Sequence, residues 1–121
     1  MRAITEIKKV EQKDLQLFLN ALNHYAGTMQ FLMETMDNSK FAIEMSIAVE
    51  MWYEFKKKTI GQFPPKYSLL KLSVHKSYIL CSALREYARV SRNDLEKSRS
   101  NRFSMVIDQQ LPTRTQLALN N

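Results

Sequence analysis

Apolar residues recur at steps of three and four along residues 14–36, and this is the strongest helix pattern in the chain. The apolar positions are Leu15, Phe18, Leu19, Leu22, Tyr25, Ala26, Met29, Leu32, Met33 and Met36. Asp14 stands where a helix N-cap belongs, because its short side chain can accept a hydrogen bond from a free N–H of the first turn. The pattern predicts a helix over residues 14–36, ended by the turn-forming residues 37–39.

A second helix is predicted over residues 40–58, with apolar side chains around most of its circumference. The main stripe consists of Phe41, Met45, Ala48, Trp52 and Phe55, and the apolar residues off that stripe are Ile43, Ile47 and Met51. A helix of this kind is normally packed between neighbours. It would be the central helix of the domain, or its second face would contact another chain. We expect Trp52 to be buried between the first and third predicted helices.

A third amphipathic pattern covers residues 66–92, directly after two prolines that break any preceding helix. Its apolar face consists of Leu69, Leu72, Ile79, Leu80, Ala83, Tyr87 and Val90, and its basic face of Lys71, Tyr78, Arg85, Arg89 and Arg92. Lys76 projects toward the apolar side, where it would snorkel to the edge or pair with an acidic residue of the second helix. The candidate acidic residues are Glu44, Glu50 and Glu54. The pattern predicts one long helix.

The two ends of the chain lack a sustained pattern. Residues 1–13 could form a short strand, a frayed helical turn or an arm that orders on a partner. The polar residues after Arg92 would extend the third helix, which aligns Arg99 with the basic face, or start a new segment at Asn93. Residues 103–111 have weak β character. The apolar tail residues Phe103, Val106, Ile107, Leu117 and Leu119 suit docking onto a partner better than building a core.

The expected fold is all-α, a three-helix bundle over residues 14–92 with extended or partly helical arms formed by residues 1–13 and 93–121. The composition agrees, since 121 residues include only two glycines, and sheets with tight hairpins use more. Residues 1–55 carry five Lys and Arg against eight Asp and Glu, whereas residues 56–121 carry thirteen against four. The basic half would attract an acidic half, in the same copy or another, or would contact a polyanion.

Secretion and membrane insertion find no support in the sequence. The first residues contain no apolar h-region, and no apolar run approaches the ~18 residues of a membrane span. The single cysteine, Cys81, cannot form an internal disulfide, and we expect a small packing residue in preference to a reactive thiol. The expected location is the cytoplasm, or a particle assembled there.

Patterns for catalysis and for metal or cofactor binding are missing from the sequence. His24 and His75 lie on different predicted helices and lack metal-ligand spacing. His75 and Cys81 are separated by about 120° around one helix, so they do not face each other as a base and a nucleophile would. No glycine-rich phosphate loop, CxxC, HExxH or GxSxG occurs. We expect a non-enzymatic protein without a metal, cofactor or small-molecule substrate.

The remaining features favour an interaction protein, a subunit of a larger assembly such as a virion or nucleoprotein particle. Its protein partners would contact Ile43, Ile47, Met51 and the apolar tail residues, and an acidic partner would contact the basic face with Arg99. The alternative is sequence-independent nucleic-acid binding, in which Arg85, Arg89 and Arg92 contact phosphates while Tyr78 stacks on a base or sugar. No known nucleic-acid-binding motif accompanies these residues.

Overall fold

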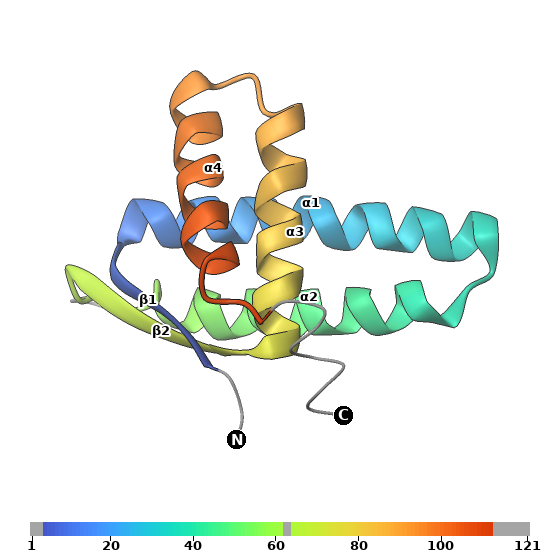
Figure 1. Ribbon diagram of the computed structural model, residues 1–121, viewed down its shortest axis with the longest axis horizontal. Helices are drawn as coiled ribbons and strands as arrows, with labels where there is room; N and C mark the ends of the chain where they lie inside the picture. Colours follow the sequence, from blue (N-terminus) through green and yellow to red (C-terminus); the bar gives the residue numbers. More distant parts are fainter. Residues whose placement is uncertain (1–3, 62–63, 113–121) are drawn as a thin grey trace.

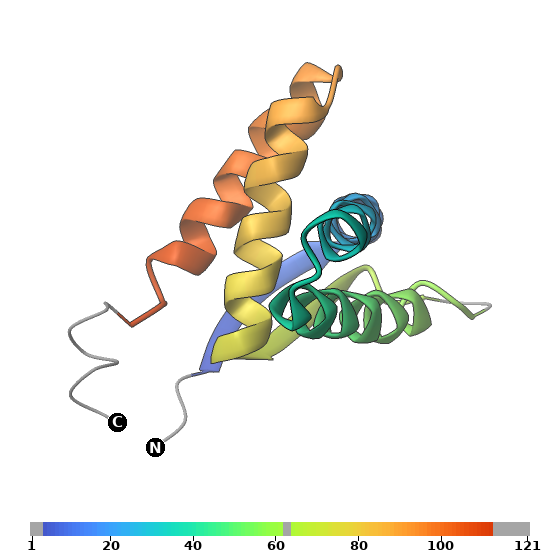
Figure 2. The same cartoon turned by 90° about the vertical axis from the view of Figure 1, so that its right-hand side faces the viewer.

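The computed structural model describes residues 4–61 and 64–112, and it shows a mostly helical fold with one small sheet. In chain order the elements are β1 (Ile4–Glu11), α1 (Gln12–Met36), α2 (Ser39–Lys57), β2 (Tyr67–Ser73), α3 (Val74–Val90) and α4 (Asp94–Asp108). α1 and α2 form a long antiparallel hairpin, and the shorter α3–α4 hairpin lies across α1 (Figure 1). Turned by 90°, the α3–α4 hairpin stands on one side of the α1–α2 pair (Figure 2).

The sheet lies at one end of the molecule, and the turn between α1 and α2 lies at the other (Figure 1). The first two predicted helices are confirmed to within two residues at either end. Asp37 ends α1 in the left-handed conformation, with φ of 46°, and Asn38 caps α2 by accepting the N–H of Lys40 at 2.9 Å. Asp14 is not the N-cap of α1, because the helix begins at Gln12 after Glu11. No helix of the described residues has the length and apolar character needed to cross a membrane.

The single helix predicted over residues 66–92 is wrong, because its first part is the strand β2. In β2 the side chains of Leu70 and Leu72 are buried while their neighbours Leu69 and Lys71 are exposed, which is the two-residue period of a strand. Ser73 then caps α3, since its Oγ accepts the N–H of Lys76 at 3.3 Å.

Most of the two segments predicted as arms belongs to the folded unit. β1 is the short strand that was one of the alternatives for the N-terminus, and it pairs antiparallel with β2. Residues 94–108 form α4, which begins after the side-chain cap of Asn93 and packs on α3. The weak β character of residues 103–111 therefore does not correspond to a strand. The mostly helical character of the prediction is confirmed, and α4 agrees with the alternatives of a partly helical C-terminal arm and a new segment at Asn93. The two-stranded sheet was not anticipated.

One core joins all six elements. Phe18 of α1 is fully buried at its centre, with its ring 6.1 Å from that of Phe55 on α2 and 4.9 Å from that of Phe103 on α4. β1 and β2 add buried aliphatic side chains to the same core, namely Ile7, Val10, Leu70 and Leu72.

Trp52 is not buried between α1 and α3, contrary to the prediction. It is half-buried at the edge of the core, beside Leu22 and Ala26 of α1, and its ring contacts that of Tyr53. The buried residues of α2 are Ala48, Met51 and Phe55. The helix is therefore rotated so that Met51 takes the interior position that the apolar stripe assigned to Trp52.

Buried and half-buried polar groups connect elements that are distant in sequence. Lys76 pairs with Glu54 at 2.7 Å and Glu50 at 3.5 Å, which confirms two of its three predicted partners. The third candidate, Glu44, accepts the hydroxyl hydrogen of Tyr25 at 3.0 Å. These bonds join α2 to α3 and to α1.

We expect the protein to become less stable at alkaline pH because of Tyr25 and Lys76. Burial and the bond to Glu44 raise the pKa of Tyr25 above its ordinary value, and the bond to Glu54 raises the pKa of Lys76. The folded state therefore keeps protons that the unfolded chain releases above pH ~10, so stability falls as the pH rises beyond that value. Urea midpoints between pH 8 and 11 measure the fall. A Tyr25→Phe variant should fall less steeply, and an unchanged slope would contradict this role of Tyr25.

Candidate interaction surfaces

The predicted basic face is not a continuous array of free cations. Arg85 lies 3.3 Å from Asp108 of α4, and Arg89 lies 3.3 Å from Glu86 one turn earlier on α3. Neighbouring carboxylates thus offset part of the charge that these two arginines would offer to a partner.

The other members of the predicted face have separate positions. The side chain of Arg99 is only 14% exposed and forms an ion pair with Asp14. This pairing indicates a structural role for Arg99. Lys71 lies on β2, and Arg92 is exposed in the α3–α4 connection. Tyr78 lies on α3 with 36% of its surface exposed, and its hydroxyl donates to the carbonyl of Pro112 at 3.0 Å.

The predicted apolar contact residues also differ in burial, since some lie in the core and others are exposed. Met51, Phe103 and Ile107 are buried in the core of this chain, so the fold itself uses them, and Ile47 is half-buried against that core. Ile43 and Val106 are exposed, at 61% and 37%. Leu117 and Leu119 lie outside the described residues.

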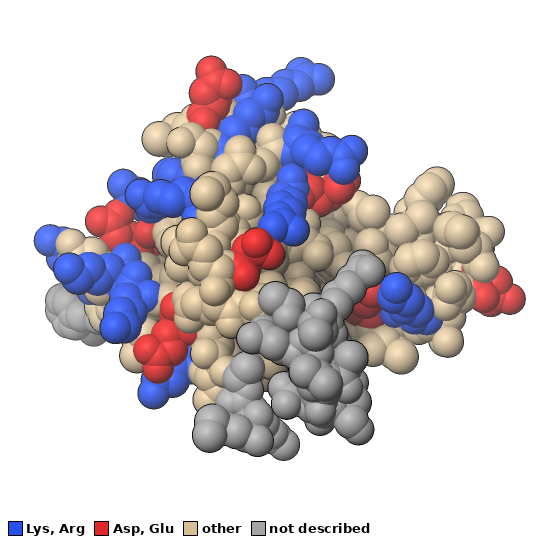
Figure 3. Space-filling model, in the orientation of Figure 1, with Lys and Arg blue, Asp and Glu red and all other residues tan. Residues whose placement is uncertain are grey.

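Cations without a carboxylate partner among the described residues gather mainly around the sheet. We name those at and beside the sheet the cationic end; it consists of Lys8, Lys9, Lys57, Lys58, Lys66, Lys71 and Arg102. Lys56, Arg92 and Lys97 also lack a carboxylate partner within residues 4–61 and 64–112 and are not counted in it. The space-filling view shows Lys and Arg at the end of the molecule where β1 and β2 lie, on the left (Figure 3). Sequence reasoning missed this surface because its members come from four elements and their connections. The Lys8-Lys9 pair beside a strand pattern and the lysines that end α2 were its only local signals.

Two grooves flank the sheet within the cationic end. The β2 groove, of about 550 Å³, is lined by residues 69–72 of β2, by Glu54, Phe55 and Lys57 of α2, and by the C-cap Lys58. The β1 groove, of about 620 Å³, is lined by residues 6–9 of β1 and by Arg102, Phe103, Val106 and Gln110. Each groove combines apolar side chains with three cations.

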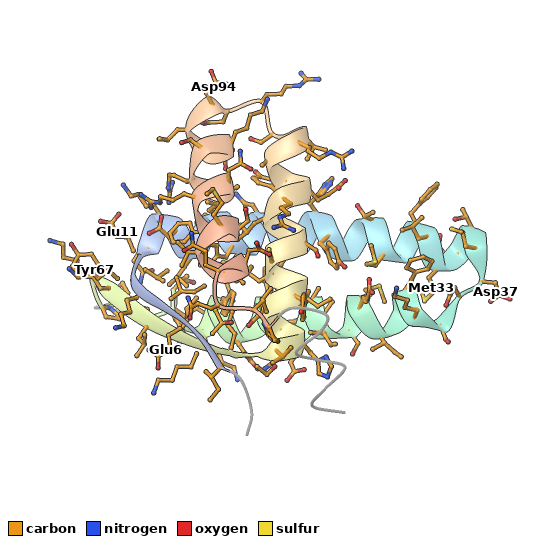
Figure 4. The ribbon with its side chains drawn as sticks, viewed as in Figure 1. Glu6, Glu11, Met33, Asp37, Tyr67 and Asp94 are labelled. Carbon is orange, nitrogen blue, oxygen red and sulfur yellow. The ribbon has the colours of Figure 1, made fainter. Side chains whose placement is uncertain are left out.

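The opposite end of the molecule has a different chemistry. Phe31 and Met36 in the last turns of α1 and Ile43 in the first turns of α2 are each more than 60% exposed. Asp37 lies at the outer end of the α1–α2 hairpin, whereas Tyr67, the first residue of β2, lies at the other end of the molecule (Figure 4). We name Phe31, Met36 and Ile43 the apolar end. Exposed apolar side chains that gather in one region mark contact sites more often than isolated ones do.

The cysteine and the two histidines lie outside these surfaces, on helices of the fold. Burial raises the pKa of the Cys81 thiol, and its Sγ lies 3.5 Å from the carbonyl oxygen of Ser104, as suits a packing residue. His24 lies on α1 and His75 on α3. Within residues 4–61 and 64–112, no group of His, Cys, Asp and Glu side chains could hold a metal ion.

Comparison of the chain with models of protein families, with curated proteins and with solved structures finds no match. Its own surfaces therefore carry the inference about function.

Proposed function

We propose that this chain is a non-enzymatic binding subunit of a larger assembly, such as a virion or nucleoprotein particle. The observation that carries the proposal is the contrast between the two ends of the molecule, one cationic and one apolar. A subunit with two chemically different contact sites can bind two different surfaces at once, of other copies or of other proteins.

The cationic end would bind an anionic protein surface. Charge complementarity speeds and orients association, and apolar side chains in the same grooves add contact area. Arg85, Arg89 and Arg92 contribute less in this proposal than the sequence suggested, because two of the three already lie beside carboxylates. A single, buried cysteine is compatible with a reducing compartment such as the cytoplasm.

Sequence-independent nucleic-acid binding is the second candidate. The cations around the sheet could contact phosphates, and Tyr67, 47% exposed with Lys66 5.3 Å from its ring centre, could stack on a base. Both candidates use the cationic end, and a direct comparison of an acidic polypeptide with an oligonucleotide distinguishes them.

Two matched triple variants provide the test, each removing three cations. The first is Lys57→Ala/Lys58→Ala/Lys71→Ala in the cationic end, and the second is Arg85→Ala/Arg89→Ala/Arg92→Ala on α3. Fluorescence anisotropy with labelled poly-L-glutamate at about 0.15 M salt should show at least ~10-fold weaker binding for the first and under ~3-fold for the second.

A labelled oligothymidylate measured in parallel separates the two candidate functions. Tight binding of the oligonucleotide near physiological salt, without binding of polyglutamate, would make nucleic-acid binding the main function. A chain that stays monomeric in light scattering and binds neither probe would contradict both.

A further inference from the structure

The outer edge of β1 is closed by a side chain. Gln110 accepts the N–H of Glu6 through Oε1 and donates from Nε2 to the carbonyl of Glu6, both at 2.9 Å. The amide thus makes the pair of bonds that a neighbouring antiparallel strand would make. A bulge follows, where Lys9 has φ of 54°, and bulges interrupt strand pairing. This edge is already protected.

The main chain of β2 points partly away from β1. Lys71 lies directly opposite Glu6, and opposite residues of an antiparallel pair either exchange both backbone bonds or direct both outward. Because the main chain of Glu6 is bonded to Gln110, the N–H and C=O of Lys71 also point outward. Alternation along the strand gives Leu69 the same direction.

These outward groups of β2 lack a partner in the described part of the chain. The next residue in the alternation, Ser73, has its carbonyl bonded by the hydroxyl of Ser77 at 2.7 Å, which agrees with an outward direction. No described residue outside β1 forms a hydrogen bond with the main chain of residues 67–72. An unpaired strand edge of this kind is a template for another strand.

The β2 groove runs along this edge. Four consecutive residues of β2 line it, residues 69–72, and no residue of β1 does. Successive side chains of a strand point to opposite faces, so a hollow that touches four in a row lies beside the strand's edge. Its far wall is the last part of α2, with Phe55 in the core behind it. The volume of about 550 Å³ leaves room for a segment of extended chain.

The charge of the groove identifies the kind of occupant. Lys57, Lys58 and Lys71 line it, and its one carboxylate, Glu54, is engaged by Lys76 at 2.7 Å. A second copy pairing through the same edge would bring these lysines together, and their repulsion disfavours that arrangement. We propose that the β2 groove binds an extended acidic segment of a partner protein, which adds to β2 as a third strand and places its carboxylates on these lysines.

This inference rests on the proposed function and deepens it, because it names what the cationic end binds. The probe is a short fluorescein-labelled peptide of alternating valine and glutamate, measured by anisotropy with the full chain. We expect binding to fall about 10-fold or more when alternate residues of the peptide are N-methylated, since methylation removes the donors that pair with β2.

Substitutions in the chain itself also test whether the peptide adds to the edge of β2. Leu69→Pro removes an outward N–H without touching the ladder to β1, a place where a strand tolerates proline, and should weaken binding about 10-fold. Lys57→Ala/Lys58→Ala should weaken it by a similar factor. The matched control is Arg89→Ala/Arg92→Ala, which removes two cations outside the cationic end and should change the affinity less than ~2-fold. Circular dichroism checks that each variant is folded.

Each contrary outcome has a distinct meaning. Equal affinity for the plain and N-methylated peptides would overturn strand addition, and this readout does not depend on any variant folding. If polyglutamate still binds in that case, the proposed function stands without the inference. Displacement of the peptide by oligothymidylate at lower concentration than by polyglutamate would overturn the acidic peptide in favour of nucleic acid.

Discussion

Phe18→Ala should destabilise the protein by about 3–5 kcal/mol, since a large buried side chain leaves a cavity that the surroundings only partly fill. Phe18 is fully buried, and its ring meets Phe55 of α2 and an edge-on Phe103 of α4. One substitution therefore weakens the packing of three helices. Small domains have ~5–15 kcal/mol of stability in total, so the variant should be unfolded in a measurable fraction of molecules.

Urea unfolding followed by circular dichroism measures this effect as a lower midpoint at unchanged slope. Phe31→Ala is the matched control, because it makes the same change in the same helix at a side chain that is 62% exposed. Its effect should stay within ~0.5 kcal/mol. Trp52→Ala should fall between the two, because Trp52 is half-buried at the core's edge. A loss below ~1.5 kcal/mol for Phe18→Ala would contradict the central position of Phe18.

The helices α1 and α2 were predictable because their signals are local. Apolar spacing along one segment and three turn-forming residues between the segments determine both helices and their antiparallel arrangement. The rotation of α2 was not predictable in this way. Met51 is interior and Trp52 peripheral because of how α1 and α3 pack on α2. Apolar residues nearly encircle α2, so the sequence pattern does not show which of them face the core.

The strand β2 was mistaken for helix because its apolar residues satisfy both periods. Leu69 and Leu72 have helical spacing, whereas Leu70 and Leu72 alternate as a strand does. The deciding partner is β1, which lies more than fifty residues earlier in the chain. Strand pairing at that separation overrides local preference, and no window of neighbouring residues contains it.

The surroundings of the predicted basic face could not be read from one helix for the same physical reason. A single helix face was expected to gather the cations, but Arg85 and Arg99 meet carboxylates that α4 and α1 bring to them. The cations of the cationic end, which lack such partners in the described residues, come together only when β1, β2, α2 and α4 are assembled. The imbalance of charge between the two halves was correct as a count, although it could not locate the surface.

The buried ion pair between Asp14 and Arg99 carries the second large effect. It joins the first turn of α1 to α4 across 85 positions of sequence, and the side chains are only 4% and 14% exposed. The carboxylate also accepts the N–H of Glu11 at 3.0 Å, so Asp14 is the third-residue member of a capping box whose N-cap is Glu11. Removing one charge leaves the other buried without its partner, and such losses cost ~3–5 kcal/mol.

A double-mutant cycle separates the pair from the cap. Asp14→Asn removes the charge and keeps an oxygen for the N–H of Glu11, and Arg99→Met removes the guanidinium and keeps most of the apolar stem. We expect each single variant to lose ~3 kcal/mol and the double variant to lose much less than their sum, a coupling of at least ~2 kcal/mol.

The control for this cycle is the exposed pair Lys13–Glu11, at 3.2 Å, whose side chains are 67% and 37% exposed. Water screens that pair, so its coupling should be below ~0.5 kcal/mol and should shrink further in salt. The coupling of Asp14 with Arg99 should persist in ~1 M salt, because no ions reach a buried pair. A coupling below ~1 kcal/mol would mean that Arg99 can turn to solvent, and it would then return to the set of cations available to a partner.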